Sequence, residues 1–468
     1  MSSDMGHSYW VSSTPRTGHP ALDHDRTADV AVIGGGIAGL CTAWELARAG
    51  AEVVVLEGDR IVRGVSGHTT GKLTALHGLT YGRVRREHGA EAAGLYAAAQ
   101  QDAMERVAAL CAELEIDAEL ERAPAYTYAT DPDGVGELEQ EAEAAREAGL
   151  DAAFVTETEL PFEVAGAVRV PDQYQFHPRR FLLGLAAALS ARGMRIYEHS
   201  RVVEVHERAH CVLRLENGST VSAGDVVVAT GFPVTAHTAL LARLSVRREL
   251  VLAAPVDADG APRGMYLTPE DGVRSVRTAP YEGGRRLLVV TGEAFEPGAP
   301  DTDARLARLA EWAARFGIAE PWYRWAAQDV HSVDGLPLVG HEHPDTQHVF
   351  VATGFGGWGL TNGVAAGPLL AAHVTGAPRP AWTELLDPRR RLPFRDVPSV
   401  LRSQASVARH YVAGRSHVRC PHMGCELGFN TAERTWECPC HGSRFAADGS
   451  LLQGPATRGL EEVPEPPE

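Results

Sequence analysis

Four of the seven cysteines of this chain lie together near its C-terminus, in a segment that also holds histidines. The spacing gives two pairs, C-x-H and C-x-x-H, with 15 residues between them. Deprotonated thiols and neutral imidazoles bind metals, so the pairs predict a centre with two sulfur and two nitrogen ligands. Such a set suits a structural zinc ion, or a [2Fe–2S] cluster in which one iron takes both thiolates and the other both imidazoles. The four ligands are Cys420, His422, Cys438 and His441.

The run Cys-Pro-Cys-His-Gly-Ser over residues 438–443, together with the gap between the pairs, closely resembles the Rieske family of iron–sulfur proteins. The resemblance favours the [2Fe–2S] cluster over zinc and implies a small all-β domain around it. It also implies a disulfide between Cys425 and Cys440 that holds the two ligand loops together, and a hydrogen bond from Ser443 to a cluster sulfur. In this family the edge with the two histidines lies at the surface, which implies that electrons leave there.

A ring-hydroxylating oxygenase also carries a Rieske domain, but it needs a second domain in which two histidines and a carboxylate hold a mononuclear iron. No such domain fits into the remaining chain, because a different site accounts for those residues.

That site begins with a glycine-rich turn near the N-terminus. Residues 34–39 match G-x-G-x-x-G, follow an apolar segment (29–33) and precede a segment of helical composition (38–49). An acidic residue ends the next strand about 20 residues on, as the dinucleotide fingerprint requires. The glycines let the backbone approach a pyrophosphate, and the helix N-terminus supplies amide donors. The alternative is an ordinary glycine-rich turn. The residues assigned here are Gly34, Gly36, Ile37, Ala38, Gly39 and Glu57.

Three later features favour FAD over NAD as the dinucleotide. The loop 66–73 fits a segment that wraps around a flavin, and 226–231 is a strand of small residues that ends near a dinucleotide. A second glycine turn, 354–359, precedes a helix whose N-terminal dipole could stabilise a reduced flavin. The residues assigned to these features are Ser66, His68, Thr69, Thr70, Gly71, Lys72, Leu73, Thr230, Gly231, Gly354, Gly356, Gly357, Trp358 and Gly359.

From about Asp29 to Thr375 the chain resembles the D-amino-acid-oxidase-like family of FAD oxidoreductases, and residues 325–340 look like the family's segment before its C-terminal flavin turn. Members oxidise C–N bonds of amines and amino acids, or sometimes C–O bonds. The resemblance implies bound FAD, a discontinuous flavin domain interleaved with a substrate domain, and a backbone contact from Val202 to the adenine.

Two residues of the flavin loop each allow two interpretations. By resemblance, His68 is either a contact of the flavin ring or the site of a covalent bond to the flavin 8α-methyl group. Lys72 either contacts the N5 region of the flavin or lies on the surface. No catalytic residue can be assigned. The candidates for the substrate pocket are Tyr266, Arg277, Tyr281, Trp325, His331 and Trp358, and an arginine among them could clamp a carboxylate.

These sites require an α/β Rossmann-like FAD-binding domain, an interleaved α+β substrate domain and a small all-β Rieske domain. We expect an N-terminal extension (1–27), an oxidoreductase (28–385), a linker (386–399) and the Rieske domain (400–468). Within the oxidoreductase, the FAD-binding parts are about 28–80, 165–240 and 328–380, and the substrate domain is about 81–164 and 241–327. Residues 81–149 are expected to be mostly helical, and residues 240–294 mostly strand.

Composition narrows the partners and the compartment. The chain has 468 residues and a net charge of −17, which disfavours nucleic acid and anionic membranes and would suit a basic redox partner. No apolar run approaches the ~20 residues of a membrane span. Met1 to Thr27 lack the apolar core of a signal peptide, so we expect a cytoplasmic protein.

A flavin takes up two electrons together and a Rieske cluster carries one, so the pair predicts a two-to-one electron converter. A small substrate, such as an amine or amino acid, would reduce FAD, and the cluster would pass electrons to an external acceptor. The alternative is a reductase in which NAD(P)H reduces FAD and the cluster supplies an oxygenase. A third interpretation is a redox sensor that uses Cys425 and Cys440.

Phe445 yields a prediction about the cluster potential. Many relatives carry a tyrosine there, and a phenylalanine cannot donate that hydrogen bond. We therefore expect a midpoint potential below that of the respiratory relatives, within a class that spans roughly −150 to +300 mV. Redox titration of the cluster measures it, and a midpoint as high as theirs would contradict the prediction.

Overall fold

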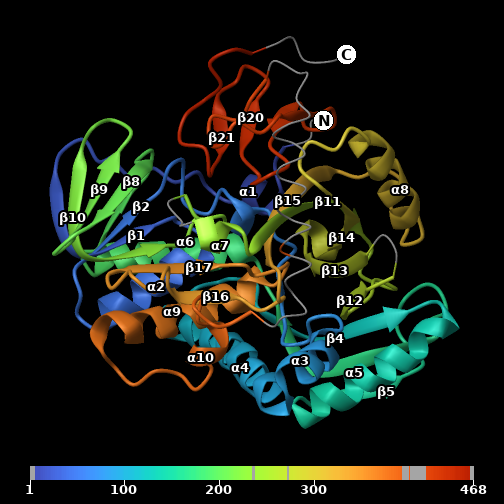
Figure 1. The fold of residues 1–468 in the computed structure, drawn as a ribbon. Helices are drawn as coiled ribbons and strands as arrows, with labels where there is room; N and C mark the ends of the chain where they lie inside the picture. Colours follow the sequence, from blue (N-terminus) through green and yellow to red (C-terminus); the bar gives the residue numbers. More distant parts are fainter. Residues whose placement is uncertain (1–5, 235–237, 271–272, 393–399, 401–417, 464–468) are drawn as a thin grey trace.

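The structure, a computed structural model, describes residues 6–234, 238–270, 273–392, 400 and 418–463. Figure 1 shows two large sheets flanked by helices, with a small β-domain as a separate lobe (red) above them. This arrangement confirms the predicted fold class. Of the predicted linker, residues 393–399 lie outside the described residues, as do residues 401–417 and 464–468 of the predicted Rieske domain.

The first sheet has eight strands in the order β16-β17-β10-β1-β2-β7, and β9 and β8 extend it from β10. Strands β17, β10, β1, β2 and β7 run parallel, so their carboxyl ends meet at one edge, where ligands bind in open α/β sheets. The strands are β1 (Arg26–Ile33), β2 (Val53–Leu56), β7 (Arg195–Tyr197), β8 (Val202–Glu207), β9 (Cys211–Leu215), β10 (Thr220–Val228), β16 (Leu338–His341) and β17 (Val349–Thr353).

Helices cover one face of this sheet and share a single apolar core with it. Helix α9 packs on α2 at close range, because Gly363 and Gly367 face Ile37 and Cys41 with no side chain between them. The helices are α1 (Tyr9–Ser12), α2 (Ile37–Arg48), α3 (Thr80–His88), α4 (Ala90–Glu113), α5 (Val135–Glu147), α6 (Pro178–Ala191), α7 (Thr238–Leu241), α8 (Thr302–Ala314), α9 (Gly359–Thr375) and α10 (Thr383–Leu386).

The second sheet has nine strands in the order β15-β11-β14-β13-β12-β4-β6-β3, with β5 beside β6. Strand β4 lies within a region predicted to be mostly helical. The sheet also takes up β3 and β6 from segments predicted to bind FAD, so the predicted domain boundaries and the sheets divide the chain differently. The strands are β3 (Lys72–Leu73), β4 (Glu121–Ala129), β5 (Ala153–Val155), β6 (Gly166–Gln175), β11 (Leu244–Val256), β12 (Met265–Thr268), β13 (Arg274–Pro280), β14 (Arg286–Phe295) and β15 (Tyr323–Ser332).

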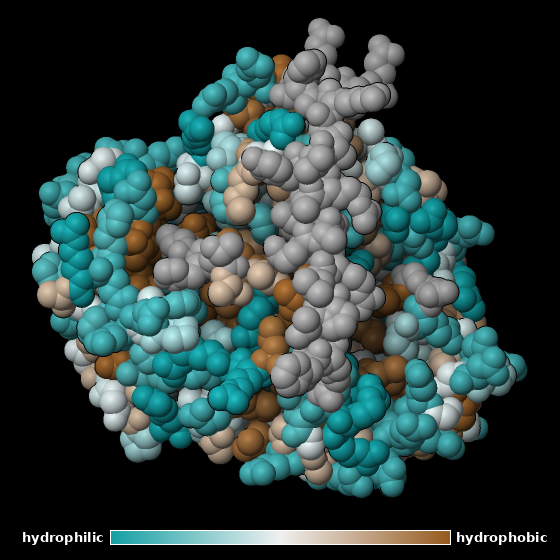
Figure 2. Space-filling view, in the orientation of Figure 1, coloured by the Kyte–Doolittle hydropathy of each residue, from teal (hydrophilic) through white to brown (hydrophobic). Residues whose placement is uncertain are grey.

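The C-terminal lobe is a four-stranded antiparallel sheet with its own small core. Its strands are β18 (Gly428–Asn430), β19 (Thr435–Glu437), β20 (Arg444–Ala446) and β21 (Leu451–Gln453). None of the helices in the described ranges is long and apolar enough to cross a membrane. In Figure 2 hydrophilic residues predominate around the periphery of the molecule, and hydrophobic ones are seen mainly in recesses.

A buried ion pair joins the C-terminal lobe to the nine-stranded sheet. The Arg248 side chain on β11 is fully buried and contacts the carboxylates of Glu433 and Glu437. Glu437 also accepts hydrogen bonds from the amide of Gly298 (2.9 Å) and the side chain of Asn430 (3.1 Å). Burial alone would raise the pKa of Glu433, but the positive charge of Arg248 holds it well below its usual value. Arg444 contacts the same two carboxylates, so two cations and two anions compensate one another in the interface and hold the lobe against the sheet.

We expect Arg248→Leu to destabilise the C-terminal lobe by about 3–5 kcal/mol, because it leaves two buried carboxylates that share a single cation, Arg444. Denaturant unfolding, followed through the visible absorption of the cluster, measures the loss. Arg214→Leu is the matched control: its pair with Glu204 is nearly half exposed on both sides, so about 1 kcal/mol or less is expected. Equal effects of the two substitutions would contradict the prediction.

Candidate functional site

The segments assigned to FAD come together at the carboxyl edge of the eight-stranded sheet. Gly34 N–H donates to the carbonyl of Leu56 at 2.9 Å, which joins the glycine turn to the end of β2. On the other side, the Thr353 hydroxyl at the end of β17 donates to Gly231 O at 2.5 Å. The ends of four neighbouring strands therefore form one continuous rim.

The turn at residues 34–39 requires glycine at two positions. A Cβ on Gly39 would lie 1.9 Å from Gly34 O, and one on Gly34 would lie 2.5 Å from Ala229 O. Gly34 also has φ +108°, which side chains rarely allow. Helix α2 begins within this turn, at Ile37, whose amide donates to the hydroxyl of Ser66 in the flavin loop at 3.0 Å. The N-terminus of a helix at this place suits a bound pyrophosphate.

Glu57 lies at the end of β2, beside this turn. Its carboxylate accepts hydrogen bonds from the amides of Gly35 and Asp59, both at 2.9 Å, and burial raises its pKa. Val202 begins β8 nearby, two residues after Ser200, whose amide donates to Glu57 O (2.8 Å). The positions of Glu57 and Val202 suit the adenosine end of a dinucleotide, and both assignments remain predictions.

The flavin loop 66–73 and the inner face of the nine-stranded sheet enclose a polar hollow. Lys72, Glu249, Asp329 and His331 line it and are only half-buried. Nevertheless, burial lowers the pKa of Lys72 to about 8 and raises that of Asp329 to about 6. These side chains lie on one face of the sheet, where the charge of Glu249 acts on Lys72 and His331. Lys72 therefore does not lie on the outer surface; its ammonium group donates to the Ser275 hydroxyl.

The second glycine turn, 354–359, closes this hollow. Gly356 N–H donates to Val330 O at 2.9 Å, and the amide of Gly357 hydrogen-bonds the Asp329 carboxylate. Helix α9 follows, again without a side-chain cap. Its positive N-terminal end can stabilise negative charge in the hollow.

The N-terminal extension is part of this site, which the sequence did not indicate. Trp10 is fully buried against the nine-stranded sheet, and its indole N–H donates to Thr69 O at 2.6 Å. The Ser8 hydroxyl donates to Gly67 O. Trp10 of α1 and the N-cap residue Ser8 therefore hold the flavin loop from behind. A Ser-Tyr-Trp run in an otherwise polar extension is the signal that could have found it.

Arg277 also contacts the flavin loop and the N-terminal extension. It donates to Gly71 O (3.1 Å) and Phe176 O (3.3 Å), and its guanidinium lies over the Trp10 ring, 5.1 Å from the ring centroid. It therefore positions the flavin loop, and a carboxylate clamp by an arginine of the pocket remains a prediction.

The other candidates for the substrate pocket lie in different parts of the structure. Tyr266 stacks on Tyr126 (4.6 Å) in the core on the opposite face of the sheet, away from the hollow. Tyr281 packs against the N-terminal extension, and Trp325 donates from its indole to His68 O at 2.8 Å. Only two of the six line a cavity, of about 340 Å³, beside the second glycine turn: His331 and Trp358.

His68 lies on the side of the hollow toward the C-terminal lobe. Its Nδ1 lies 3.0 Å from Gly64 O, and burial lowers its pKa. The charges of Arg444 and Glu433 in the C-terminal lobe also act on this imidazole. Covalent attachment of flavin through His68 remains a prediction.

The cluster ligands lie on two loops with the same design. In each loop a glycine four residues after the cysteine donates its N–H to the carbonyl of that cysteine: Gly424 to Cys420 (2.8 Å) and Gly442 to Cys438 (2.9 Å). Both glycines have a left-handed φ near +78°. The repeated turn aims a cysteine and a histidine from each loop at one point.

The residues at this point fit a Rieske cluster. The Nδ1 atoms of His422 and His441 are buried and have no hydrogen-bond partner, and the two imidazole centroids are 5.1 Å apart. Cys420 and Cys438 are buried free thiols. A hydrogen bond from Cys438, helped by one from Ser443, lowers the pKa of Cys420 to about 7 despite burial. Two orphaned imidazole nitrogens beside two thiols are the donors that such a cluster takes.

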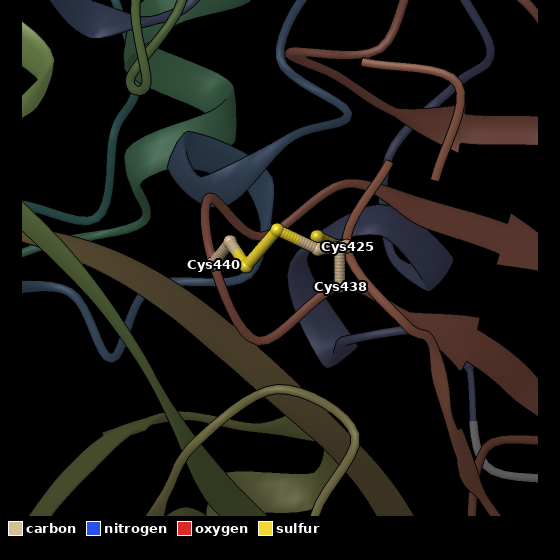
Figure 3. Close-up of side chains that lie close together, drawn as sticks. All are labelled: Cys425, Cys438 and Cys440. Carbon is tan, nitrogen blue, oxygen red and sulfur yellow. A yellow bond between two sulfur atoms is a disulfide. The ribbon is translucent and has the colours of Figure 1, made fainter. Parts of the chain in front are cut away.

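The other two cysteines form the predicted disulfide, Cys425–Cys440. Figure 3 shows it beside Cys438, and the three sulfurs lie within 4.8 Å of one another. Because two of these sulfurs are bonded to each other, this trio is not itself a ligand set. The disulfide instead joins the two ligand loops, as the resemblance implied.

The two histidines differ in exposure, which corrects the expectation that both lie at the surface. His441 is only 5% exposed and packs on the Phe232 ring, at 5.1 Å between centroids. His422 is half-buried on the outer loop.

Comparison with known proteins agrees with both sites. Residues 29–373 match the family described as FAD dependent oxidoreductase (DAO), and residues 400–464 match the Rieske [2Fe–2S] domain. The oxidoreductase part therefore binds FAD, and the C-terminal domain binds a [2Fe–2S] cluster.

Relatives share these parts. The YhfW protein of Bacillus subtilis (strain 168), named for a Rieske 2Fe–2S centre, is 29% identical over 97% of both chains. Gamma-glutamylputrescine oxidoreductase of Escherichia coli (strain K12) is 24% identical over 79% of this chain and 88% of its own. The structure of glycine oxidase from Geobacillus kaustophilus has the same fold over 78% of this chain and all of its own, with a TM-score of 0.63 and 22% identity.

The pKa of Lys72 gives a prediction for the flavin. Below pH 8 its ammonium group is charged and favours reduced, anionic flavin; above pH 8 it is neutral. We expect Lys72→Met to lower the flavin midpoint potential by roughly 30 mV below pH 8, a tenfold change in a two-electron equilibrium. The difference should shrink above pH 8. Spectroelectrochemical titration measures it.

Lys72→Arg is the control, because arginine stays charged across this range. Glu249, Asp329, Arg277 and His331 also contribute charge near the hollow, and they are unchanged in both variants. If the flavin midpoint potentials of the native protein and of Lys72→Met differ by the same amount at every pH, the assignment is contradicted.

Proposed function

Because the chain belongs to the D-amino-acid-oxidase-type family of FAD dependent oxidoreductases and ends in a Rieske domain, we propose that it oxidises the C–N bond of a small amine or amino acid and delivers the electrons singly to an external acceptor. When bound, FAD accepts a hydride equivalent from such a substrate, and the cluster carries one electron at a time. The product is an imine, which water hydrolyses.

The single observation that supports this proposal is the contact between the two sites. The cluster ligand His441 packs on Phe232, which directly follows the predicted flavin contacts Thr230 and Gly231. A cluster bound next to a flavin site suits electron transfer within one chain. It would have no role in an oxidase that passes electrons directly to oxygen.

The residues of the hollow suit a substrate that carries an amine. Glu249 and Asp329 are desolvated carboxylates on one sheet face, and each can accept a hydrogen bond from an amino group. Lys72 can hold negative charge on reduced flavin or on a substrate carboxylate. The names of the relatives, glycine oxidase and gamma-glutamylputrescine oxidoreductase, cover both an amino acid and an amine.

The acceptor and the compartment are part of the proposal. We infer a one-electron acceptor, either a small molecule or a redox protein, and a cytoplasmic location. The net charge of −17 would attract a basic acceptor protein.

An anaerobic optical titration with amines, amino acids and NAD(P)H tests the function. We expect an amine or amino acid to bleach the flavin and then the cluster bands, while NAD(P)H does not, since the sequence has one dinucleotide fingerprint with its acidic partner. Matched pairs, such as putrescine with ornithine and cadaverine with lysine, separate amines from amino acids. Bleaching by NAD(P)H alone would support the alternative, a reductase that feeds an oxygenase. Reduction of the flavin without the cluster would contradict the proposal.

A further inference from the structure

The two histidine ligands of the cluster site face different surroundings. His441 is buried between the two domains, whereas His422 is followed by Met423, which is 45% exposed. Met423 is one of few large apolar side chains exposed in the described part of the chain. The exposed Arg419 lies at the base of the same loop, and its guanidinium donates to Gly424 O at 2.8 Å. One histidine thus faces the flavin domain, and the other is close to solvent.

Phe232 stands between the flavin rim and His441. It lies just past the end of β10, and its carbonyl accepts a hydrogen bond from Thr230 Oγ1 at 2.8 Å. Its side chain is 4% exposed, so its ring is enclosed by protein. The ring fills the space between the carboxyl edge of the eight-stranded sheet and the imidazole.

The loop that carries His441 is also held against β15. Gln328 donates from its amide to Gly442 O at 3.1 Å, and a Cβ on Gly442 would lie 2.5 Å from that amide nitrogen. Gln328 pairs with Arg248 across β15 and β11, so both side chains lie on the face of the sheet opposite Asp329 and the hollow. With the Arg248 ion pair on the next strand, these contacts leave no room for an external partner at His441.

We propose that the two histidines have different roles in electron transfer. The His441 side, packed on Phe232, receives electrons from the flavin domain, and the His422 side, beside Met423, delivers them to the external acceptor. This rests on the proposed function. Each transfer takes one electron from reduced flavin and converts one ferric ion of the cluster to ferrous. A one-electron oxidant then returns that ion to ferric, so two oxidant molecules are reduced for each substrate and two protons are released to solvent.

The receiving side is tested by flash photoreduction of the bound flavin in the complete protein, with EDTA as electron donor, while the cluster bands are followed. We expect Phe232→Leu to slow bleaching of the cluster roughly tenfold, which corresponds to about 1.4 kcal/mol in the barrier. Phe429→Leu is the matched control, since Phe429 is a buried ring in the core of the same domain, packed on Trp436. EPR spectra and redox titration check that the cluster and its potential are unchanged.

If Phe232→Leu leaves the rate of cluster reduction unchanged, or if Phe429→Leu slows it equally, the assignment of the His441 side as the receiving side is overturned. If Phe232→Leu fails to retain the cluster, Phe232→Met, which keeps a similar volume, takes its place under the same criterion.

The delivering side is tested with ferricyanide, a small anionic one-electron oxidant, added to pre-reduced protein. We expect Met423→Glu to slow reoxidation of the cluster and Met423→Lys to speed it, each by roughly tenfold. Leu452→Glu and Leu452→Lys are the controls, because Leu452 has the same exposure (46%) in the same domain but lies on β21, outside the ligand loops. Equal effects at the two positions, or none at Met423, would overturn the assignment.

These experiments do not depend on a substrate, since EDTA only supplies electrons to the photoexcited flavin. If amines and amino acids fail to reduce the flavin but photoreduction still reaches the cluster at a rate set by Phe232, the substrate proposal fails and the division between the histidines stands.

Discussion

The buried pairing of Arg248 with Glu433 and Glu437 sets the position of the whole C-terminal domain. With Arg444, which contacts the same two glutamates, four charges are removed from water, and this cost is offset only while they stay in contact. The interface therefore tolerates little rotation or sliding. Because the ion pair lies on the strand next to Gln328, it also fixes the loop of His441 against the flavin domain. A mobile Rieske domain could move toward partner proteins. In this chain the domain instead keeps a constant contact with the flavin domain.

A second constraint acts from the opposite end of the chain. Trp10 and Arg277 support the flavin loop from behind, and the loop in turn presents Lys72 to the hollow. The aromatic end of the sheet face is thereby filled by α1, and the polar end stays free. The part of this sheet face that stays free is charged, because it carries Lys72, Glu249 and Asp329.

Local motifs carried most of what could be predicted from sequence. The glycine turn, Glu57 and the four cluster ligands are recognisable because each chemistry needs fixed spacing along the chain, and the disulfide followed from family resemblance. Long-range pairing escaped prediction: Arg248 meets Glu437 across 189 residues, and charged residues in a strand usually face water. Strand β4 was missed because its alanines suit a helix, although Ala-Tyr-Thr-Tyr-Ala (125–129) alternates with a period of two. The contact between Arg277 and Trp10 could not be predicted, because nothing near Arg277 in the sequence indicates that the N-terminal segment packs there.

The N-terminal segment has a consequence for how the protein is made. Trp10 leaves the ribosome before all of the strands that it touches, and its partners on β14 and β15 are synthesised last. At 5–20 residues per second, the segment waits for roughly fifteen seconds to a minute before it can dock. The flavin loop lacks its support throughout that time, so a stable holoprotein can form only after nearly all of the oxidoreductase part has been translated. The N-terminal support of the flavin loop is therefore completed late in synthesis.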